Sequence, residues 1–267
     1  QMEHSYDLGE MYGENYGYRS GLNASMVAHL NSKVDRILKL VDLKHGDLVI
    51  DIGSNDSTTL QAYPCSEPIL VGVDPTGIKF HSYYPKHIQL IPDFFSAALI
   101  KEKFPQKKAK VITSFSMFYD LEDPMGFMQQ VYDVLAEDGV WVFEQSYMPM
   151  MLETNSFDTI CHEHIEYYKL TDIKNICTQA GLEIKDVEFN DVNGGSFSIL
   201  VGHINGSFIQ SDSTRKVLQN ESTKDWNLEF KKFNKRINLL KEETLTLLES
   251  LKAQGKRVVG IGASTKG

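Results

Sequence analysis

Five short apolar stretches, each rich in β-branched residues and closed by a polar turn, constrain the fold of this chain more than any other feature. They begin at Leu48, Ile69, His87, Lys108 and Glu137, and segments typical of helices lie near residues 95–104 and 124–136. Strands that alternate with helices need crossover connections, which are right-handed in almost all folds and give a parallel sheet with helices on both faces. The pattern predicts an α/β, doubly wound, mostly parallel sheet.

After the fifth strand the order of elements changes. A helix is expected over residues 171–181, followed by a strand from Leu182, a Gly-Gly turn at Gly194 and a further strand. Two consecutive strands that are joined without a helix pair as an antiparallel hairpin. We therefore predict a seven-stranded sheet with an antiparallel hairpin at one edge.

The segments outside this sheet divide the chain further. Residues 211–254 are highly charged and carry apolar residues at helical spacing, such as Phe233 and Leu240, which predicts one or two amphipathic helices. The terminal stretch GKRVVGIGASTKG has the pattern of a new strand and a Gly-rich turn. We predict an N-terminal capping segment (1–30), a principal domain (31–205), a helical connector (206–254) and the start of a truncated second α/β domain (255–267). Because the chain stops inside that motif, we expect it to be a piece of a longer protein.

Composition and charge argue against several classes of partner. The 267 residues are 42% hydrophobic, which suffices for a packed core, and the formal net charge of -9 without a basic patch argues against nucleic acid. No apolar run approaches the roughly 18–20 residues of a membrane span, and the first residues do not resemble a secretory signal, so we predict a cytoplasmic protein. The cysteines Cys65, Cys161 and Cys177 are widely spaced and predict neither disulfides nor a paired-cysteine zinc site.

Acidic residues close the first three predicted strands. Asp51 ends the first strand, and Gly53 lets the backbone turn at the edge where open α/β sheets bind ligands. Asp74 follows Gly53 by 21 residues, where a carboxylate can accept hydrogen bonds from both hydroxyls of a ribose. Asp93 and the phenylalanines after it can hold an adenine. The full predicted cofactor set is Asp51, Gly53, Ser54, Asn55, Asp74, Pro75, Asp93, Phe94, Phe95 and Ser114.

The loop after the first strand also discriminates between cofactors. It has neither the GxGxxG pattern of dinucleotide sites nor a Walker lysine. A group of carboxylates disfavours a pyrophosphate and suits the cationic sulfonium and uncharged ribose of S-adenosylmethionine, which would leave S-adenosylhomocysteine as the product. In the alternative interpretation the loop is only a turn and Asp74 caps a helix.

The stretch FDTICHEHIEYY, residues 157–168, holds the strongest candidates for catalysis. Cys161, His162 and His164 are metal-ligand types, but histidines two residues apart diverge on a helix, so the spacing predicts no metal site. A solvated loop with ordinary histidines is the plain alternative. The stretch follows the fifth strand and can fold over the carboxyl edge of the sheet. There a histidine can take a proton from a carbon next to a ketone, because its pKa of about 6.5 lies near neutral pH.

Four stretches resemble a known family, the nucleotide-sugar C-methyltransferases that methylate a ring carbon of TDP-4-keto-deoxysugars. They are YGENYGYRSGLN (12–23), DIGSNDS (51–57), FDTICHEHIEYY (157–168) and GKRVVGIGASTKG (255–267), in the order in which the family has them. The resemblance implies a class I methyltransferase sheet and a base at His164, with Glu163 beside it and Tyr16 near the reacting sugar. It also implies deprotonation next to the C4 ketone and attack of the enolate on the sulfonium methyl group.

The chain departs from the family in three places. Relatives usually carry an N-terminal zinc module of cysteine pairs, so zinc is expected only if the full protein has such a module. Some relatives have a tyrosine at the position of Cys161 and a histidine near Tyr119, which leaves the sugar and the methylated carbon open; Tyr119 is kept as a catalytic candidate. The second α/β half, which helps to hold the nucleotide in the family, is not present before Gly267.

Residues predicted to contact the substrate come from three segments of the chain. They are Tyr18, Arg19, Tyr168, Asn193, Gly195 and Ser196. The expected partner is a small nucleotide sugar, and the expected state is a monomer or a weak homo-oligomer. Two other functions stay open at this point. One is methyl transfer to oxygen or nitrogen, which needs no carbon acid, and the other is a non-catalytic cofactor-binding scaffold that assembles through the apolar stripe of residues 211–254.

Overall fold

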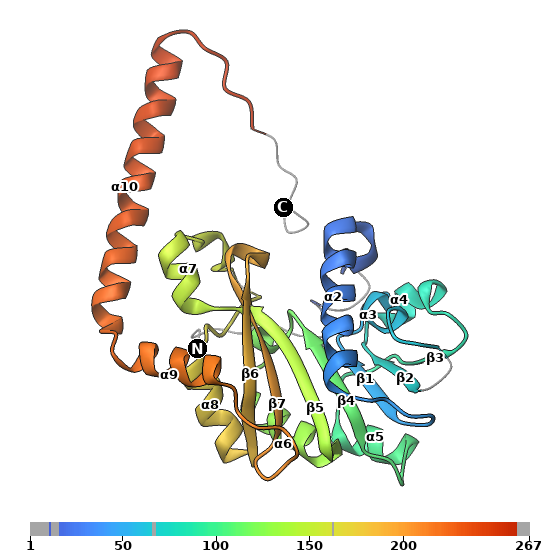
Figure 1. Ribbon diagram of the computed structural model, residues 1–267. Coiled ribbons are helices and arrows are strands. Elements are labelled where there is room, and N and C mark those ends of the chain that lie inside the picture. The colour runs from blue at the N-terminus through green and yellow to red at the C-terminus, as the bar shows by residue number, and fades with distance from the viewer. Residues whose placement is uncertain (1–10, 12–15, 66–67, 162, 261–267) are drawn as a thin grey trace.

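A seven-stranded sheet forms the centre of the molecule, with helices on both of its faces (Figure 1). The computed structural model describes residues 11, 16–65, 68–161 and 163–260. The strands lie in the order β3-β2-β1-β4-β5-β7-β6. Their bounds are β1 Leu48–Ile52, β2 Ile69–Val73, β3 Ile88–Ile91, β4 Ala109–Phe115, β5 Leu135–Ser146, β6 Leu182–Asn190 and β7 Ser196–His203.

The pairing of the strands confirms the predicted sheet. β1 to β5 pair in parallel, and β7 lies antiparallel between β5 and β6. The carboxyl ends of the parallel strands share one edge, and β7 runs in the opposite direction. The turn before it, η5 (Val192–Gly194), therefore lies at that same edge, near the end of β5. Loops that are far apart in the sequence thus meet at one edge of the sheet.

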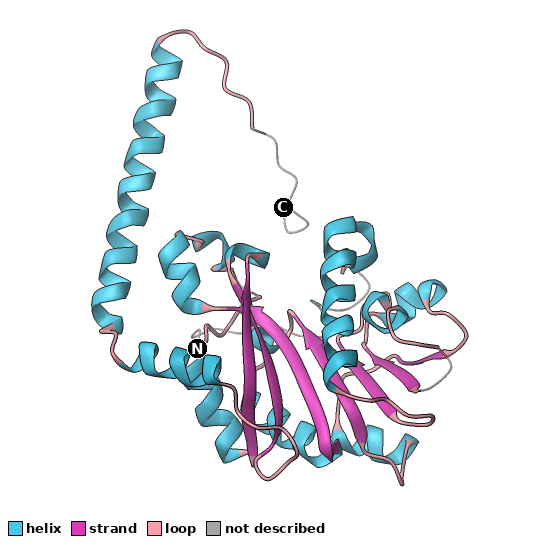
Figure 2. Cartoon of the chain, in the orientation of Figure 1, coloured by secondary structure: helices cyan, strands magenta, loops and turns pink. Residues whose placement is uncertain are grey.

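Helices cover the sheet (Figure 2), and apolar layers hold them against it. The helices are α2 (Ala24–Leu40), α3 (Thr58–Gln61), α4 (Gly77–Phe80), α5 (Ala97–Lys103), α6 (Pro124–Val134), α7 (Met148–Thr154), α8 (Leu170–Gln179), α9 (Asp212–Ser222) and α10 (Trp226–Ala253). One layer joins α2 and α3 to the sheet through Ile37 and Leu60. The larger layer, with α5, α6 and α8, surrounds the stacked rings of Trp141 and Phe143. Each such buried side chain contributes about 1.5–3 kcal/mol, so packing rather than helix propensity fixes these helices.

Several helices, α2 and α7 among them, do not follow the segments predicted from the sequence. α2 continues without a break through residue 30, where the predicted capping segment ends, and the Asn23 side chain caps it by accepting from the backbone N–H of Ser25. α7 begins almost directly after β5, with Pro149 in its first turn, where a missing N–H leaves no hydrogen bond unmade. The chain therefore turns at the carboxyl end of β5, and α7 lies at that edge of the sheet.

The predicted connector helices are α9 and α10. α10 projects from the body of the molecule (Figure 1), and none of its residues is buried. The strand predicted after it is not formed in residues 256–260, because an extended segment without a neighbouring strand has no partner for its backbone hydrogen bonds; its remaining residues lie outside the described part. Among the described helices, none combines the length and the apolar character needed to cross a membrane.

Candidate active site

The backbone after β1 opens toward the carboxyl edge of the sheet. Gly53 has a φ of +74°, a left-handed conformation that glycine adopts without strain, and it is exposed while its neighbours Ile52 and Ser54 are buried. The Ser54 hydroxyl is 2.8 Å from the Tyr84 hydroxyl, which itself donates to the carbonyl of Asn55. The loop is thus held by hydrogen bonds to Tyr84, and its backbone is exposed at Gly53.

Two of the predicted strand-end acids lie together under this loop. Asp51 is buried and accepts from the Thr113 hydroxyl at 2.5 Å; burial, together with the nearby charge of Asp74, raises its pKa to about 7. Oδ1 of Asp74 accepts from the backbone N–H and the hydroxyl of Thr76, and Oδ2 accepts from the backbone N–H of Asn55 at 2.7 Å. These bonds close a turn at the end of β2, and the N-cap residue of α4 is Thr76 rather than Asp74. Oδ2 of Asp74 keeps acceptor capacity for a ligand hydroxyl.

The third acid lies at the end of its strand as predicted, but one of its two aromatic neighbours is arranged differently. Asp93 is exposed at the end of β3, and Phe94 is 45% exposed beside it. Phe95 is not available as a wall for an adenine, because its ring packs into the core against Phe127 with a centroid distance of 5.3 Å. Pro75 is partly buried at the end of β2.

The structure also contradicts the prediction for Ser114. This side chain is fully buried, and its hydroxyl accepts from the indole N–H of Trp141 at 3.0 Å. Successive side chains of a strand point to opposite faces, and on β4 this alternation directs Ser114 into the core under the helices. It contacts the core rather than a ligand.

Residues 16–22, which we call the N-terminal strap, are tied to the loop after β1. The Asn55 side chain accepts from the backbone N–H of Ser20 and donates to the carbonyl of Tyr18, and Asp56 accepts from the backbone N–H of Gly21 at 3.0 Å. The Arg19 guanidinium lies 4.0 Å above the ring of Tyr83 and 3.9 Å from Asp56. Hydrogen bonds between residues that lie 35 to 37 positions apart in the sequence thus hold the strap against the predicted cofactor loop.

Tyr16 of the strap lies between the two halves of the site. Its pKa is raised, first by burial and then by the negative charges of Asp120, Asp74 and Glu163. Asp74 belongs to the cofactor edge, whereas Glu163 belongs to the stretch predicted to be catalytic. Tyr16 is therefore near enough to both segments for the charges of Asp74 and Glu163 to act on its hydroxyl.

Residues 163–168 fold over the loop after β4, as predicted. The backbone N–H of Glu166 donates to the carbonyl of Tyr119 at 3.1 Å, and the rings of Tyr119 and His164 have centroids 4.0 Å apart. Nδ1 of His164 is 3.0 Å from the carbonyl of Thr159. A carbonyl only accepts, so Nδ1 carries the hydrogen and the lone pair of the neutral ring is on Nε2.

Cys161 and Glu163 stand beside this histidine. Sγ of Cys161 is 4.0 Å from Oε2 of Glu163, and donor atoms of Cys161, Glu163 and His164 all lie within 4.8 Å of one another. The ligand types considered in the sequence were Cys161, His162 and His164. His162 lies outside the described residues, and Glu163 joins the other two here.

The predicted substrate contacts are only partly brought together. Tyr168 is buried in the core against Phe118, with its hydroxyl inside, because its backbone pairs with that of Tyr147; the structure thus contradicts a substrate contact. Asn193 is exposed at the hairpin turn of the carboxyl edge. Gly195 packs on Met150 of α7, and the buried Ser196 donates to the carbonyl of Val192.

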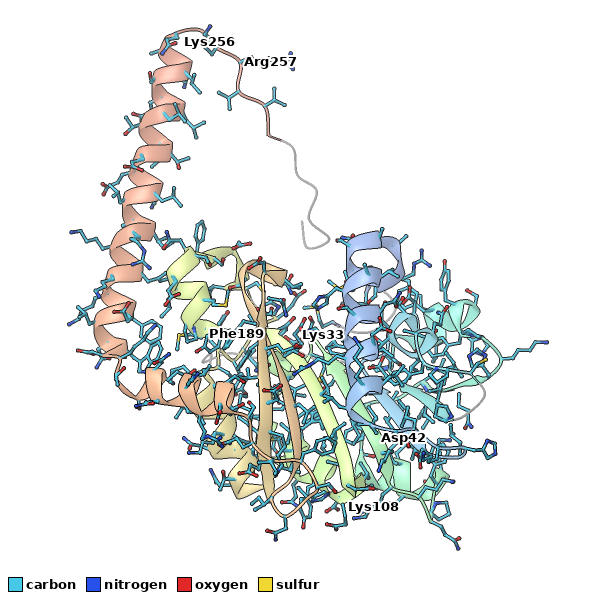
Figure 3. The ribbon with its side chains drawn as sticks, viewed as in Figure 1. Lys33, Asp42, Lys108, Phe189, Lys256 and Arg257 are labelled. Carbon is cyan, nitrogen blue, oxygen red and sulfur yellow. The ribbon has the colours of Figure 1, made fainter. Side chains whose placement is uncertain are left out.

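The sequence analysis missed a buried ionic cluster next to this edge. Glu144 on β5 accepts from Lys33 at 2.9 Å and from Asn190 at 2.9 Å, and it contacts Nε2 of His29 at 2.6 Å. Burial would raise the pKa of Glu144, but His29 and Lys33 outweigh it and the pKa is lowered. Figure 3 shows Lys33 reaching from α2 toward the sheet. The available signal was an acid inside the apolar run VWVFEQS.

Comparison with solved structures agrees with the fold. A chain of the complex between the Haloferax volcanii Trm112 methyltransferase activator and a methyltransferase has a TM-score of 0.51 at 12% identity, over 67% of this chain and 95% of that chain. Magnesium protoporphyrin IX methyltransferase of Synechocystis, solved with bound SAH, has a TM-score of 0.50 at 12% identity, over 70% of this chain and 90% of that chain. The predicted class I sheet is confirmed.

Sequence comparison gives the family. The chain is 28% identical over 269 residues to C-methyltransferase NovU of Streptomyces niveus; the match covers 100% of this chain but only 64% of that relative's length. Residues 191–267 match the C-methyltransferase C-terminal domain. Residues 24–187, more than half of the chain, match the methyltransferase domain. The chain therefore belongs to the methyltransferase domain family, which confirms the predicted class of enzyme.

Proposed function

We propose that this chain transfers a methyl group from S-adenosylmethionine to a ring carbon next to the ketone of a nucleotide-linked keto-deoxysugar, with His164 as the base. The observation that carries the proposal is the position of Tyr16, whose pKa is raised by burial and by the charges of both Asp74 and Glu163. This proximity of Tyr16 to both charges supports a site that the cofactor edge and the His164 segment share. The similarity to a C-methyltransferase supports carbon as the acceptor.

The residues at the edge of β1 and β2 fit this cofactor. Gly53 exposes backbone in a left-handed turn, and Asp74 retains acceptor capacity for a ribose hydroxyl. When bound, S-adenosylmethionine supplies an electrophilic methyl group on a sulfonium. The carboxylate of Asp74, buried under the loop, favours that positive charge in a site of low dielectric.

Proton abstraction is the task assigned to His164. The bond from Nδ1 to Thr159 keeps the lone pair on Nε2, which takes the proton from the carbon next to the ketone. The electron pair of that C–H bond moves into the enolate, whose carbon would accept the methyl group that bound S-adenosylmethionine would supply, with S-adenosylhomocysteine as the leaving group. Glu163 stabilises the imidazolium through its opposite charge.

We assign the stabilisation of the enolate oxygen to two phenols, those of Tyr16 and Tyr119. Burial raises the pKa of Tyr119 and of Tyr16, so both hydroxyls stay protonated at neutral pH and can donate a hydrogen bond. A donor that is already oriented in a buried site typically contributes about 3–4 kcal/mol to the stabilisation of a developing oxyanion.

The test is hydrogen exchange at the carbon acid. We expect the chain with S-adenosylhomocysteine to exchange deuterium into a TDP-4-keto-deoxysugar, and His164→Ala to reduce the rate by about 10²-fold or more. Calorimetry should find the affinity for S-adenosylhomocysteine unchanged in His164→Ala and lost in Asp74→Ala.

Two results would contradict the proposal. Exchange that is as fast in His164→Ala as in the native chain would show that His164 is not the base. Methyl transfer to oxygen or nitrogen without any exchange would replace the carbon acceptor, while cofactor binding without any transfer would favour a scaffold.

A further inference from the structure

Three side chains of different chemistry converge beside the proposed base. Sγ of Cys161, a carboxylate oxygen of Glu163 and a ring nitrogen of His164 lie within 4.8 Å of one another, and each side chain is half-buried. We propose that this group binds a zinc-type divalent cation and that the bound ion blocks His164. Binding itself is independent of the proposed function; only the inhibition rests on it.

The donor set matches the preferences of Zn²⁺. Thiolate, imidazole and carboxylate bind zinc at about 2.3, 2.0 and 2.1 Å, so ligand atoms of a tetrahedral site lie roughly 3.4–3.6 Å apart. Sγ of Cys161 is 4.0 Å from Oε2 of Glu163, so this pair has to close by about 0.5 Å. The other two pairs of ligand atoms lie at most 4.8 Å apart, so each has to close by no more than about 1.4 Å.

The surroundings of His164 are those of a metal ligand as well as of a base. Histidines that bind metals usually donate their other ring N–H to a carbonyl or a carboxylate, which fixes the tautomer. Here Nδ1 of His164 is 3.0 Å from the carbonyl of Thr159, and the same carbonyl accepts from the hydroxyl of Tyr167 at 3.3 Å. Nε2 is therefore the atom offered to an ion.

The local backbone explains why the sequence argument pointed away from a metal. On a helix, side chains two residues apart diverge, and the spacing of His162 and His164 therefore predicted no metal site. Cys161, Glu163 and His164 lie instead in a bend, a turn and an irregular segment, which let nearby residues point inward together. The set that converges includes a carboxylate and does not depend on His162.

Three protein ligands leave one coordination position open, as in reactive rather than structural zinc sites. On binding, the thiol of Cys161 loses its proton to solvent as the sulfur–metal bond forms, and no group is oxidised or reduced. The ion takes the lone pair of Nε2, so His164 cannot hold the metal and accept a substrate proton at the same time. Zinc and catalysis are therefore mutually exclusive.

The first test measures binding without any sugar. We expect the tag-free, chelator-stripped chain to bind one equivalent of Zn²⁺ in competition with a chromophoric chelator, and Co²⁺ to give a thiolate-to-metal charge-transfer band. Cys161→Ala should abolish the band and weaken zinc binding at least about tenfold, and Glu163→Gln should weaken it with the band retained. Cys65→Ala, a change of the exposed cysteine far from the cluster, should do neither.

The second test uses the exchange assay. Zinc should inhibit exchange with a midpoint that follows the measured zinc affinity, and in Cys161→Ala the midpoint should rise by the same factor, relative to that variant's own zinc-free rate. Zinc affinity that is equal in the native chain, Cys161→Ala and Glu163→Gln would overturn the site. If exchange is absent but the cobalt band is present, the proposed function fails and the metal site stands.

Discussion

At the scale of single residues, burial sets the charge state of the acid that closes β1. The pKa of Asp51 rises to about 7, chiefly because the side chain is buried and also because Asp74 is near, while the hydrogen bond from Thr113 opposes the rise. A carboxyl group whose pKa is higher in the folded state contributes stability while it is protonated. That contribution is complete below the unfolded pKa of about 4 and is lost as the pH rises through about 7.

We expect Asp51→Asn to remove this dependence on pH, because the amide stays neutral. Between about pH 4 and pH 8, its free energy of unfolding should rise relative to that of the native chain by up to about 4 kcal/mol. Urea denaturation at a series of pH values measures the difference. Asp42→Asn is the matched control, since the Asp42 side chain is 83% exposed. A difference for Asp51→Asn that stays constant with pH would contradict a protonated Asp51.

Single positions were predictable where residue type and strand position act together. Gly53 and Asp74 lie at strand ends, and their placement follows from the pattern alone. Phe95 and Ser114 lie near the same edge, but the side of the backbone on which each side chain falls depends on strand register and on the packing of Phe127 and Trp141. A single sequence does not contain that information.

At the scale of elements, the N-terminal strap depends on a close approach at one glycine. A Cβ added to Gly21 would lie 2.6 Å from Oδ2 of Asp56, and that carboxylate cannot move freely because it also accepts from the hydroxyl of Thr58. An alanine therefore pushes the strap away and breaks the bond from the Gly21 N–H to Asp56.

We expect Gly21→Ala to lower the free energy of unfolding by about 1 kcal/mol and to weaken S-adenosylhomocysteine binding roughly fivefold. Chemical denaturation and calorimetry measure the two effects. Gly17→Ala is the control in the same strap, because no atom lies within 4 Å of its added Cβ. Equal behaviour of the two variants would show that the strap does not rest on the cofactor loop as described.

Neither the contacts of the strap nor the cluster around Glu144 could be predicted from the sequence, for the same reason. Asn55 bonds to Ser20, and Glu144 bonds to His29 and Asn190, over separations of 35 to 115 residues. Strand and helix patterns are local, whereas these polar pairs exist only after the elements have packed. The buried acid in an apolar strand could only indicate that some partner was required.

At the scale of the whole molecule, the contacts of α10 with other described residues lie at its beginning. Trp226 and Phe233 pack on a small cluster of α7 that includes Leu152, and Arg236 donates to the Asn155 side chain. The rest of the helix carries exposed leucines, such as Leu247, which is 58% exposed. The described contacts thus stabilise the first third of α10 and leave the remainder to its own helix propensity.

We expect Phe233→Ala to release this attachment. Loss of a partly buried aromatic side chain costs on the order of 1–2 kcal/mol, so amide exchange in residues 226–240 should accelerate by about tenfold, as hydrogen-exchange mass spectrometry measures. Leu247→Ala should leave exchange in those residues unchanged. Equal exchange in Phe233→Ala and the native chain would mean that α10 is held elsewhere.

The central claim concerns the distance across the site between cofactor and base. A crystal structure of the chain with S-adenosylhomocysteine tests it directly. We predict that the sulfur lies at the edge of Gly53 and Asp74, within about 8 Å of Nε2 of His164, because one methyl group and one substrate carbon must fit between them at near-attack separations. A sulfur much farther away, or a His164 ring that faces bulk solvent in that complex, would contradict the account.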